Sequence, residues 1–144
     1  MNIPAKPEAK RGAPEIKNTL KIKIYYEDTD AGGVVYYANY LRFLERARTE
    51  YLAAKGIDVA EYHNRGYFFP VIHVDIHYKK PARLGDIIEV TADLIELTNA
   101  TVTFRQEIFR DDTLLVESTV KLVCINTDGK PRRLPPEFTS FSPV

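Results

Sequence analysis

Residues 38–55 form the strongest helical pattern in the chain and restrict the fold more than any other stretch. Apolar side chains recur there at helical spacing on a broad face, which consists of Leu41, Phe43, Leu44, Ala47, Tyr51, Leu52 and Ala54. Gly56 supplies a stop at the C-terminal end. A helix of about five turns that is apolar on more than one side suits the centre of a curved sheet.

Charged side chains on this predicted helix are spaced so that they can pair along its surface. Glu45 lies three positions before Arg48, and Arg46 lies four positions before Glu50. Such pairs stabilise an exposed helix by a few tenths of a kcal/mol each. Both pairs are predicted here.

Strand patterns surround the helix. Apolar residues alternate with basic ones in residues 20–26, and four further strand patterns cover residues 67–80, 87–97, 101–110 and 114–126. The last three are separated by residues 98–100 and 111–113, which are hairpin-length connections. Residues 57–66 read as a short helix or a loop. This order predicts an α+β fold in which an antiparallel sheet wraps around one long helix.

The two ends of the chain differ from this pattern. Residues 1–18 carry three prolines, mixed charge and few large apolar groups, so we expect a flexible tail that precedes a single domain over residues 19–144. Near the other end, Asp128-Gly129 predicts a turn, and the Pro-rich segment after it is expected to lie along the surface.

Composition excludes several classes of protein. The formal net charge of the 144 residues is zero, which argues against a nucleic-acid-binding protein. The one cysteine, Cys124, cannot form an intramolecular disulfide, which fits a reducing, cytoplasmic setting. No apolar run is long enough to span a bilayer or to act as a signal peptide.

The chemistry is concentrated just before the helix. Glu27, Asp28 and Asp30 fall within four residues, and Gly32-Gly33 follows them before the helical pattern begins. Free N–H groups at a helix N-terminus stabilise a developing oxyanion, while a neighbouring carboxylate can activate water or attack directly. These are the parts that acyl transfer requires.

Two stretches carry a family resemblance. EDTDAGGVVYYANYLRFLERARTEYL (residues 27–52) and YKKPARLGD (residues 78–86) resemble the hotdog-fold acyl-CoA thioesterases of the 4-hydroxybenzoyl-CoA thioesterase type, in particular the Tol-Pal-associated bacterial branch. The similarity covers roughly residues 20–136. It implies hydrolysis of an acyl-CoA to a free acid and coenzyme A without a metal or redox cofactor. It also implies an active site at a homodimer interface, with dimers often paired into a homotetramer.

The resemblance assigns roles to particular residues. It places the active aspartate at Asp30 and a carbonyl-polarising backbone N–H at Tyr37, and it implies substrate contacts from Val35, Tyr36 and Tyr40. Most relatives of this branch have His where this chain has Tyr37, which removes a possible acid-base group here and leaves the aspartate route intact.

Each assignment has a structural alternative. As the active residue, Asp30 would act either as a general base or as a nucleophile that forms a transient anhydride. The structural alternative is that the Asp30 side chain only accepts hydrogen bonds from backbone amides of the turn. Asp28 and Glu27 are expected to shape the turn. For the tyrosines the alternative is aromatic packing.

Lys79, Lys80 and Arg83 form the densest basic cluster near a strand end and are expected either to contact the phosphates of coenzyme A or to be solvated loop residues. Arg132 and Arg133 are a weaker second candidate.

Other reactive residues have weaker contexts. His73, Asp75 and His77 share one strand face at a spacing that zinc sites use, but a polar stripe on the outer face of a sheet is the commoner result. The serines, among them Ser118, lack a G-x-S-x-G context, so a serine hydrolase is not expected. Cys124 lies among apolar strand residues and is predicted to pack in the core.

Two rival functions are compatible with the predicted fold. A hotdog hydratase or dehydratase would need a His in the core stretch, and residues 25–50 contain none. A non-catalytic module that binds acyl-CoA or an acyl carrier protein would not need Asp30, so an intact Asp30 favours catalysis. An acyl carrier protein also stays open as the source of the thioester, and the acyl group is not predicted.

Overall fold

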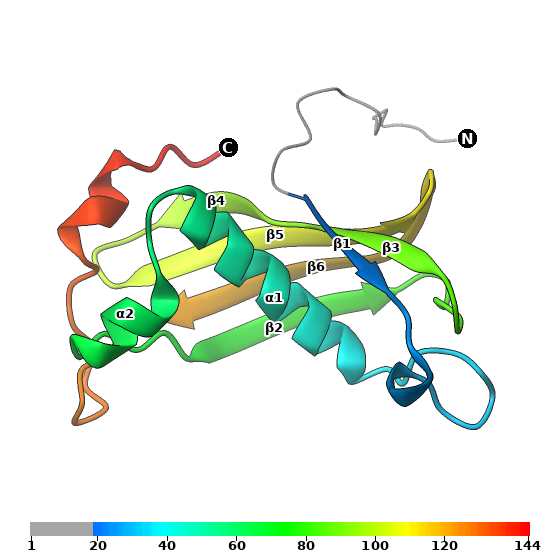
Figure 1. The fold of residues 1–144 in the computed structure, drawn as a ribbon. Helices are drawn as coiled ribbons and strands as arrows, with labels where there is room; N and C mark the ends of the chain where they lie inside the picture. Colours follow the sequence, from blue (N-terminus) through cyan, green and yellow to red (C-terminus); the bar gives the residue numbers. More distant parts are fainter. Residues whose placement is uncertain (1–18) are drawn as a thin grey trace.

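The structure, a computed structural model, describes residues 19–144 and shows a long helix lying across one face of a sheet (Figure 1). The elements in chain order are β1 (Thr19–Lys23), η1 (Tyr26–Asp28), α1 (Asn39–Ala54), α2 (Val59–Asn64), β2 (Val71–Tyr78), β3 (Ile87–Thr91), β4 (Asp93–Leu97), β5 (Thr101–Arg110), β6 (Thr113–Val123) and η2 (Pro136–Ser140). The strands pair antiparallel in the order β1-β3-β5-β6-β2, and β4 pairs with β5. The predicted α+β hotdog architecture is confirmed. The predicted tail, residues 1–18, lies outside the described residues.

Helix α1 fills the concave side of the sheet because its apolar side chains are buried on a broad face, as the sequence predicts. It buries Tyr40, Phe43, Leu44, Ala47, Arg48, Tyr51 and Leu52. The ring of Tyr51 meets the ring of Phe104 on β5 edge to face, with centroids 5.3 Å apart. Each large side chain buried in this way stabilises the fold by roughly 1.5–3 kcal/mol.

The strand predicted over residues 87–97 is wrong as one element, because it divides at Ala92 into β3 and β4. At this point β3 and β5 are joined by hydrogen bonds that involve a side chain from each strand. The Gln106 amide donates to the Thr91 carbonyl (3.1 Å), and the Glu107 N–H donates to the Thr91 hydroxyl (2.8 Å). Five strands therefore follow the helix, where four were predicted.

The predicted helical ion pair between Glu45 and Arg48 does not form. Glu45 Oε2 accepts a hydrogen bond from the Thr49 hydroxyl (2.7 Å), and the Arg48 guanidinium donates to Gln106 Oε1 (3.0 Å) instead. Arg48 is a buried residue that faces the sheet, so it cannot turn to the exposed Glu45 without losing this partner.

The C-terminal segment was predicted to lie along the surface, and this is wrong for its apolar side chains. Leu134, Phe138 and Phe141 are buried, and the Phe138 ring packs against Phe69 with centroids 5.8 Å apart. The segment lies at the same end of the sheet as α2, as Figure 1 shows.

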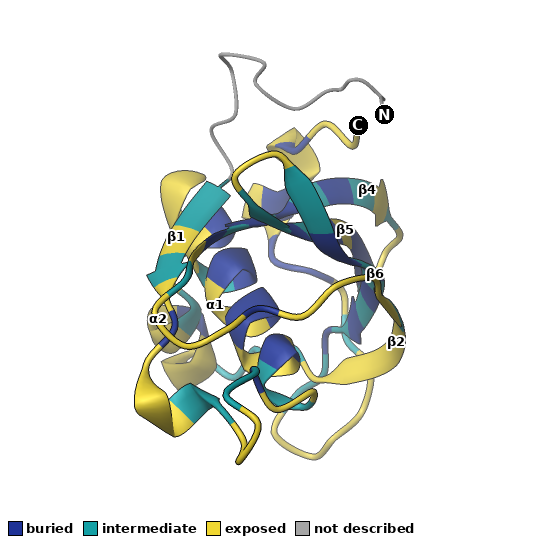
Figure 2. Cartoon of the chain, turned by 90° about the vertical axis from the view of Figure 1, so that its right-hand side faces the viewer, coloured by how far each residue is buried: buried dark blue, intermediate teal, exposed yellow. Residues whose placement is uncertain are grey.

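Strand β2 forms one edge of the sheet and is exposed on both faces (Figure 2). Val71, Ile72, Val74 and Tyr78 are among the exposed large hydrophobic residues of the described chain. An unpaired edge with exposed apolar side chains is a common site of pairing with another strand. Within residues 19–144, no helix is long and apolar enough to cross a membrane.

Candidate functional site

The Asp30 carboxylate sits in a tight turn that the Gly-Gly pair allows. Asp30 N–H donates to the Val34 carbonyl (2.9 Å), and Gly33 N–H donates to the Asp30 carbonyl (3.0 Å). Gly33 has φ 78°, a backbone conformation that favours glycine. One carboxylate oxygen, Oδ1, accepts the Gly32 N–H (2.9 Å). Oδ2 has no hydrogen-bond partner within residues 19–144, so the turn engages one oxygen of the carboxylate and leaves the other available to a ligand.

Asp28 ties this turn to the start of α1. Its side chain accepts the Tyr25 N–H (2.8 Å), as expected for a residue that shapes the turn. Its carbonyl accepts the Tyr36 N–H (3.1 Å) and the Asn39 side-chain amide (3.0 Å). The acidic turn and the helix N-terminus are therefore fixed relative to each other.

The N-terminus of α1 lacks a cap. Ala38 occupies the N-cap position without a side-chain hydrogen bond, and the first turn contains no acidic residue. In the described part of the chain, no acceptor takes the backbone N–H of Tyr37 or of Ala38. Uncapped N–H groups at a helix N-terminus are suited to bind an anionic or polarised oxygen.

An aromatic cluster holds the backbone at this position. Tyr78, at the end of β2, donates its hydroxyl to the Tyr37 carbonyl (3.0 Å). The Tyr78 ring packs against Tyr40 and Tyr37, with centroids 5.4 Å and 6.4 Å apart, and Tyr36 packs on Tyr37 at 4.9 Å. The Tyr78 hydroxyl is protonated at neutral pH and able to donate, and desolvation raises its pKa further above the ordinary value. The sequence places Tyr78 in the second stretch of the resemblance but predicts no role for it, because its partner lies 41 positions away.

The other predicted substrate residues divide by exposure. Tyr36 and Tyr37 are exposed, whereas Val35 and Tyr40 are buried. The Tyr40 hydroxyl accepts the Ala82 N–H (2.9 Å), and burial raises the Tyr40 pKa above its ordinary value. Tyr40 therefore packs in the core, which is the structural alternative given for the tyrosines, and its hydroxyl binds the loop that follows β2.

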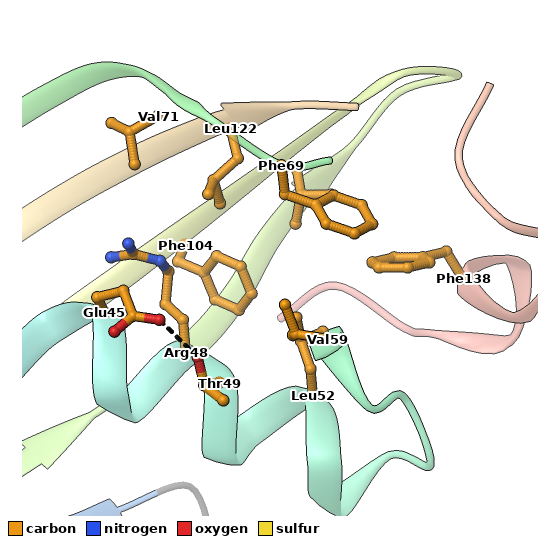
Figure 3. A pocket seen from close by; sticks show the side chains of 11 residues that line it. Glu45, Arg48, Thr49, Leu52, Val59, Phe69, Val71, Phe104, Leu122 and Phe138 are labelled. Atoms are coloured by element: carbon orange, nitrogen blue, oxygen red, sulfur yellow. Dashed lines mark hydrogen bonds between the residues drawn. The ribbon is translucent and has the colours of Figure 1, made fainter. Parts of the chain in front are cut away.

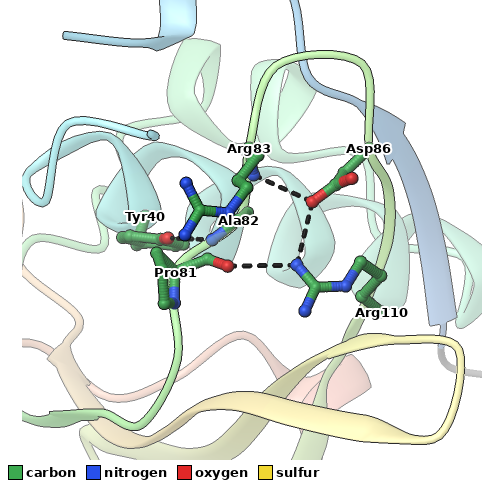
Figure 4. A network of polar contacts seen from close by, with 6 residues as sticks. All are labelled: Tyr40, Pro81, Ala82, Arg83, Asp86 and Arg110. Carbon is green, nitrogen blue, oxygen red and sulfur yellow. Dashed lines mark hydrogen bonds and ion pairs between the residues drawn. The ribbon is translucent and has the colours of Figure 1, made fainter. Parts of the chain in front are cut away.

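That loop lies beside the acidic turn. Val35 N–H donates to the Ala82 carbonyl (2.9 Å), and Leu84 N–H donates to the Gly33 carbonyl (3.1 Å). The loop is closed by Asp86, whose Oδ2 accepts the Arg83 N–H (2.8 Å) and the Arg110 guanidinium (2.9 Å), as Figure 4 shows. Arg83 is thus placed opposite Val34, four positions after Asp30.

The three predicted basic residues differ in their partners. Lys79 forms an ion pair with Glu117 (3.2 Å). Neither Lys80 nor Arg83 forms an ion pair with a described residue, and both are exposed. Figure 4 shows the Arg83 guanidinium pointing away from the Asp86 carboxylate. Lys80 and Arg83 are the two members of the cluster whose charges are available to a ligand.

An apolar groove follows α1 along the β2 edge. One cavity, of about 330 Å³, is lined by Leu41, Arg42, Glu45, Arg48, Val71, Val74 and Val120. A second cavity, of about 160 Å³, continues from Glu45 and Arg48 toward the Phe69, Phe104 and Phe138 rings (Figure 3). The groove begins within two turns of the helix N-terminus. Burial lowers the pKa of Arg48, although Glu45 opposes this effect.

The weaker candidates have structural partners. His77 contacts Asp75 (3.0 Å) on the exposed strand β2, and residues 19–144 contain no group of three or more His, Cys, Asp or Glu arranged to hold a metal ion. Arg132 stacks on Tyr67 at 3.8 Å, and Arg133 donates to Asn99 (3.3 Å). Both arginines thereby attach the C-terminal segment to the domain.

The reactive residues of the sheet are structural as well. Cys124 is buried as predicted, and burial raises its pKa. Ser118 is also buried, and its hydroxyl donates to the Gln106 carbonyl (2.9 Å).

Comparison with known proteins gives consistent matches. The family model described as the thioesterase-like superfamily matches residues 25–141. The chain is 40% identical over 121 residues to the acyl-CoA thioesterase YbgC of Haemophilus influenzae, a match that covers 83% of this chain and 89% of that protein. A probable thioesterase from Bartonella henselae superposes with a TM-score of 0.74 at 35% identity, covering 81% of this chain and 96% of that one. A hypothetical protein from Thermus thermophilus superposes with a TM-score of 0.79 at 33% identity, covering 83% and 92%.

Proposed function

The chain belongs to the thioesterase-like superfamily and is an acyl-CoA thioesterase, and from this premise we propose that Asp30 and the N-terminus of α1 carry the reaction. The observation that supports this most directly is the juxtaposition of a carboxylate that has one available oxygen with an uncapped helix N-terminus, fixed to each other through Asp28. One group can activate a nucleophile and the other can bind the oxygen that becomes negative.

In the proposed reaction, the Tyr37 N–H donates to the thioester carbonyl oxygen. Asp30 takes a proton from water as the water oxygen bonds to the carbonyl carbon, and the carbonyl electron pair moves onto the oxygen. Collapse of this intermediate breaks the carbon–sulfur bond and releases the thiolate of coenzyme A, which takes up the proton. In the nucleophilic variant, Asp30 bonds to the carbon, expels the thiolate, and water then hydrolyses the anhydride.

The substrate contacts are proposals of the same kind. We place the phosphates of coenzyme A against Lys80 and Arg83, because their charges lack described partners, and we give Lys79 a lesser role because Glu117 already neutralises it. Tyr36 is exposed and available to the pantetheine arm. The buried Val35 and Tyr40 shape the site from behind.

We propose that the active enzyme is a homodimer, or a homotetramer of paired dimers. The support is the open β2 edge, which exposes Val71, Val74 and Tyr78 next to the α1 groove. A location in the cytoplasm, membership of the Tol-Pal-associated branch and the use of an acyl carrier protein as an alternative thioester donor complete the proposal. The branch rests on the sequence resemblance, the location rests on the single cysteine, Cys124, and the carrier protein is a thioester source that the sequence leaves open.

The test is thiol release from a panel of acyl-CoAs, comprising short, medium and long aliphatic chains and 4-hydroxybenzoyl-CoA. We expect clear hydrolysis by the native protein and loss in Asp30→Asn, with Asp128→Asn, another exposed turn aspartate, as the matched control. Full activity of Asp30→Asn would remove Asp30 from the mechanism. Binding of acyl-CoA without hydrolysis by the native protein would favour the binding module.

A further inference from the structure

The Arg48 guanidinium has no carboxylate in direct contact within the described chain, although Glu45 on the same helix is near enough to raise its pKa. Arg48 is 7% exposed, and its guanidinium has one hydrogen-bond partner there, the neutral Gln106 amide oxygen (3.0 Å). No carboxylate in residues 19–144 forms an ion pair with it. A buried cation is costly unless an opposite charge lies close, so a carboxylate from outside the chain that contacts Arg48 directly would stabilise it further.

Besides contacting Gln106 on the sheet, the Arg48 side chain borders the groove. Arg48 lines both cavities of the groove, and Figure 3 shows its guanidinium directed toward Val71 on the β2 edge, away from Phe138. A group that covers the β2 edge would therefore come close to this charge.

Charges along the groove alternate in sign. Arg42, Glu45 and Arg48 are spaced by three residues on the side of α1 that lines the groove. Glu45 is exposed, and its carboxylate accepts a hydrogen bond from the Thr49 hydroxyl. Two such helices lying antiparallel with a three-residue offset would place each Glu45 opposite an arginine of the other helix. The pattern is therefore complementary to a second copy of itself.

The backbone of β2 limits how a second copy can pair there. Lys79 N–H donates to the Leu115 carbonyl of β6, and Asp75 and His77 lie in register with Thr119 and Glu117 of that strand. Because hydrogen bonds alternate along a strand, Val74, Ile76 and Tyr78 direct their N–H and C=O groups to the open side.

If the β2 strands of two copies pair antiparallel about a two-fold axis, that axis consequently passes beside Val74, Asp75 or Ile76, and this residue is the centre of the pairing. A centre at Asp75 would oppose two carboxylates, and a centre at Ile76 would shorten the paired length. A centre at Val74 places His73 of each strand opposite Asp75 of the other.

We infer that a second copy of the chain covers the groove and is related to the first by a two-fold axis near Val74. Glu45 of each copy then pairs with Arg48 of the other copy. Val74 supports this placement because it lines the same cavity as Glu45 and Arg48. The inference rests on the proposed dimer and adds to it the charged residues that select the partner and its register. The pair lies between the copies, and each dimer contains it twice.

The test uses charge reversal and mixing, with the dimer dissociation constant measured by analytical ultracentrifugation. Glu45→Lys alone opposes like charges at the interface and is expected to raise the dissociation constant by at least about 30-fold. Arg48→Glu alone is expected to do the same. A mixture of the two variants restores attraction at both contacts, so a heterodimer of near-native affinity should form. Glu50→Lys, an exposed charge reversal on α1 outside the groove, should leave the constant unchanged.

Arg48→Glu removes the Gln106 contact and can unfold the chain, so a neutral double-mutant cycle provides a second test. Glu45→Gln should weaken the native dimer about tenfold and have little effect in an Arg48→Gln background. Equal effects in the two backgrounds would overturn the inference.

The remaining outcomes separate the two proposals. A monomeric native protein would refute the dimer and the charge pair together. A native dimer that is insensitive to Glu45→Lys, or that is not restored by mixing, would refute the charge pair alone. Retained dimerisation of Arg48→Gln with selective loss of hydrolysis of an acyl-CoA that bears a terminal carboxylate would assign Arg48 to the substrate and also overturn the inference.

Discussion

Two aspartates in adjacent turns, Asp30 and Asp86, have opposite uses in this molecule. Backbone hydrogen bonds join their loops, from Val35 to Ala82 and from Leu84 to Gly33. Asp86 Oδ2 accepts both the Arg83 N–H and the Arg110 guanidinium, whereas Asp30 accepts one turn amide through Oδ1. A carboxylate with both a backbone and a charged partner serves the fold. The one that keeps an oxygen free of described partners, beside an uncapped helix, is the one suited to chemistry.

The largest expected effect separates catalysis from stability at Asp30. Asp30→Asn keeps the Gly32 N–H acceptor but cannot accept a proton from water, so hydrolysis should fall by about 100-fold or more. The free energy of unfolding should change by less than about 0.5 kcal/mol. Acyl-CoA hydrolysis and urea denaturation of the same preparation measure the two quantities. A large loss of stability would show that Asp30, like Asp86, mainly serves the fold.

Asp86→Asn should show the reverse pattern. The variant weakens the contacts to Arg110 and to the Arg83 N–H, and we expect a loss of about 2 kcal/mol in unfolding free energy. Because the loop lies beside the site, a modest decrease in kcat is compatible with this prediction. Asp112→Asn, an exposed hairpin position, is the control. Unchanged stability together with abolished hydrolysis would reverse the assignment of the two aspartates.

Tyr78→Phe tests whether the helix N-terminus needs to be positioned. The variant removes the hydroxyl that donates to the Tyr37 carbonyl and keeps the ring that packs on Tyr40. A small displacement of a donor in an active site can cost much of its effect, so kcat should fall about tenfold with little change in KM. Tyr26→Phe, at an exposed tyrosine, should behave as the native protein. An unchanged kcat would show that the Tyr37 backbone does not depend on this bond.

Arg83→Ala should act on binding and leave the chemical step intact. Its backbone closes the Asp86 turn, which alanine retains, and its side chain has no described ion-pair partner. Loss of one phosphate contact should raise KM about five- to tenfold without changing kcat. The difference from the native protein should shrink at high salt. A fall in kcat with an unchanged KM would place Arg83 near the reacting atoms instead.

Some elements of the fold could be predicted from the sequence and others could not. Periodicity identified α1, the strand β5 and the antiparallel order, because burial of repeating apolar positions determines them. The division at Ala92 was not predictable, since it depends on Gln106 and Glu107 bonding to Thr91 across the sheet. The burial of Phe138 was missed because prolines nearby suggested an exposed segment.

The site residues also divide into those that local sequence predicts and those that depend on distant contacts. Asp30, Tyr37 and Arg83 lie in continuous motifs and could be proposed from the sequence. Tyr78 and Arg48 lie in the same stretches, but their roles could not be proposed, because they come from contacts with residues 41 and 58 positions away.

The smallest expected effect concerns Tyr40, which braces the loop that carries Asp86. Burial raises the pKa of its phenol in the folded chain above the ordinary value of 10.0, so the folded state holds the proton more tightly than the unfolded state does. Stability from this group is fully present below about pH 10 and is lost as pH rises from there toward the folded pKa. Tyr40→Phe removes this titration, so its urea midpoint should fall less steeply above pH 10, from a lower starting value because Ala82 N–H loses its acceptor. Other tyrosines with raised pKa values, such as Tyr51, retain part of the slope. An identical slope in Tyr40→Phe and the native protein would mean that Tyr40 does not contribute to alkaline unfolding.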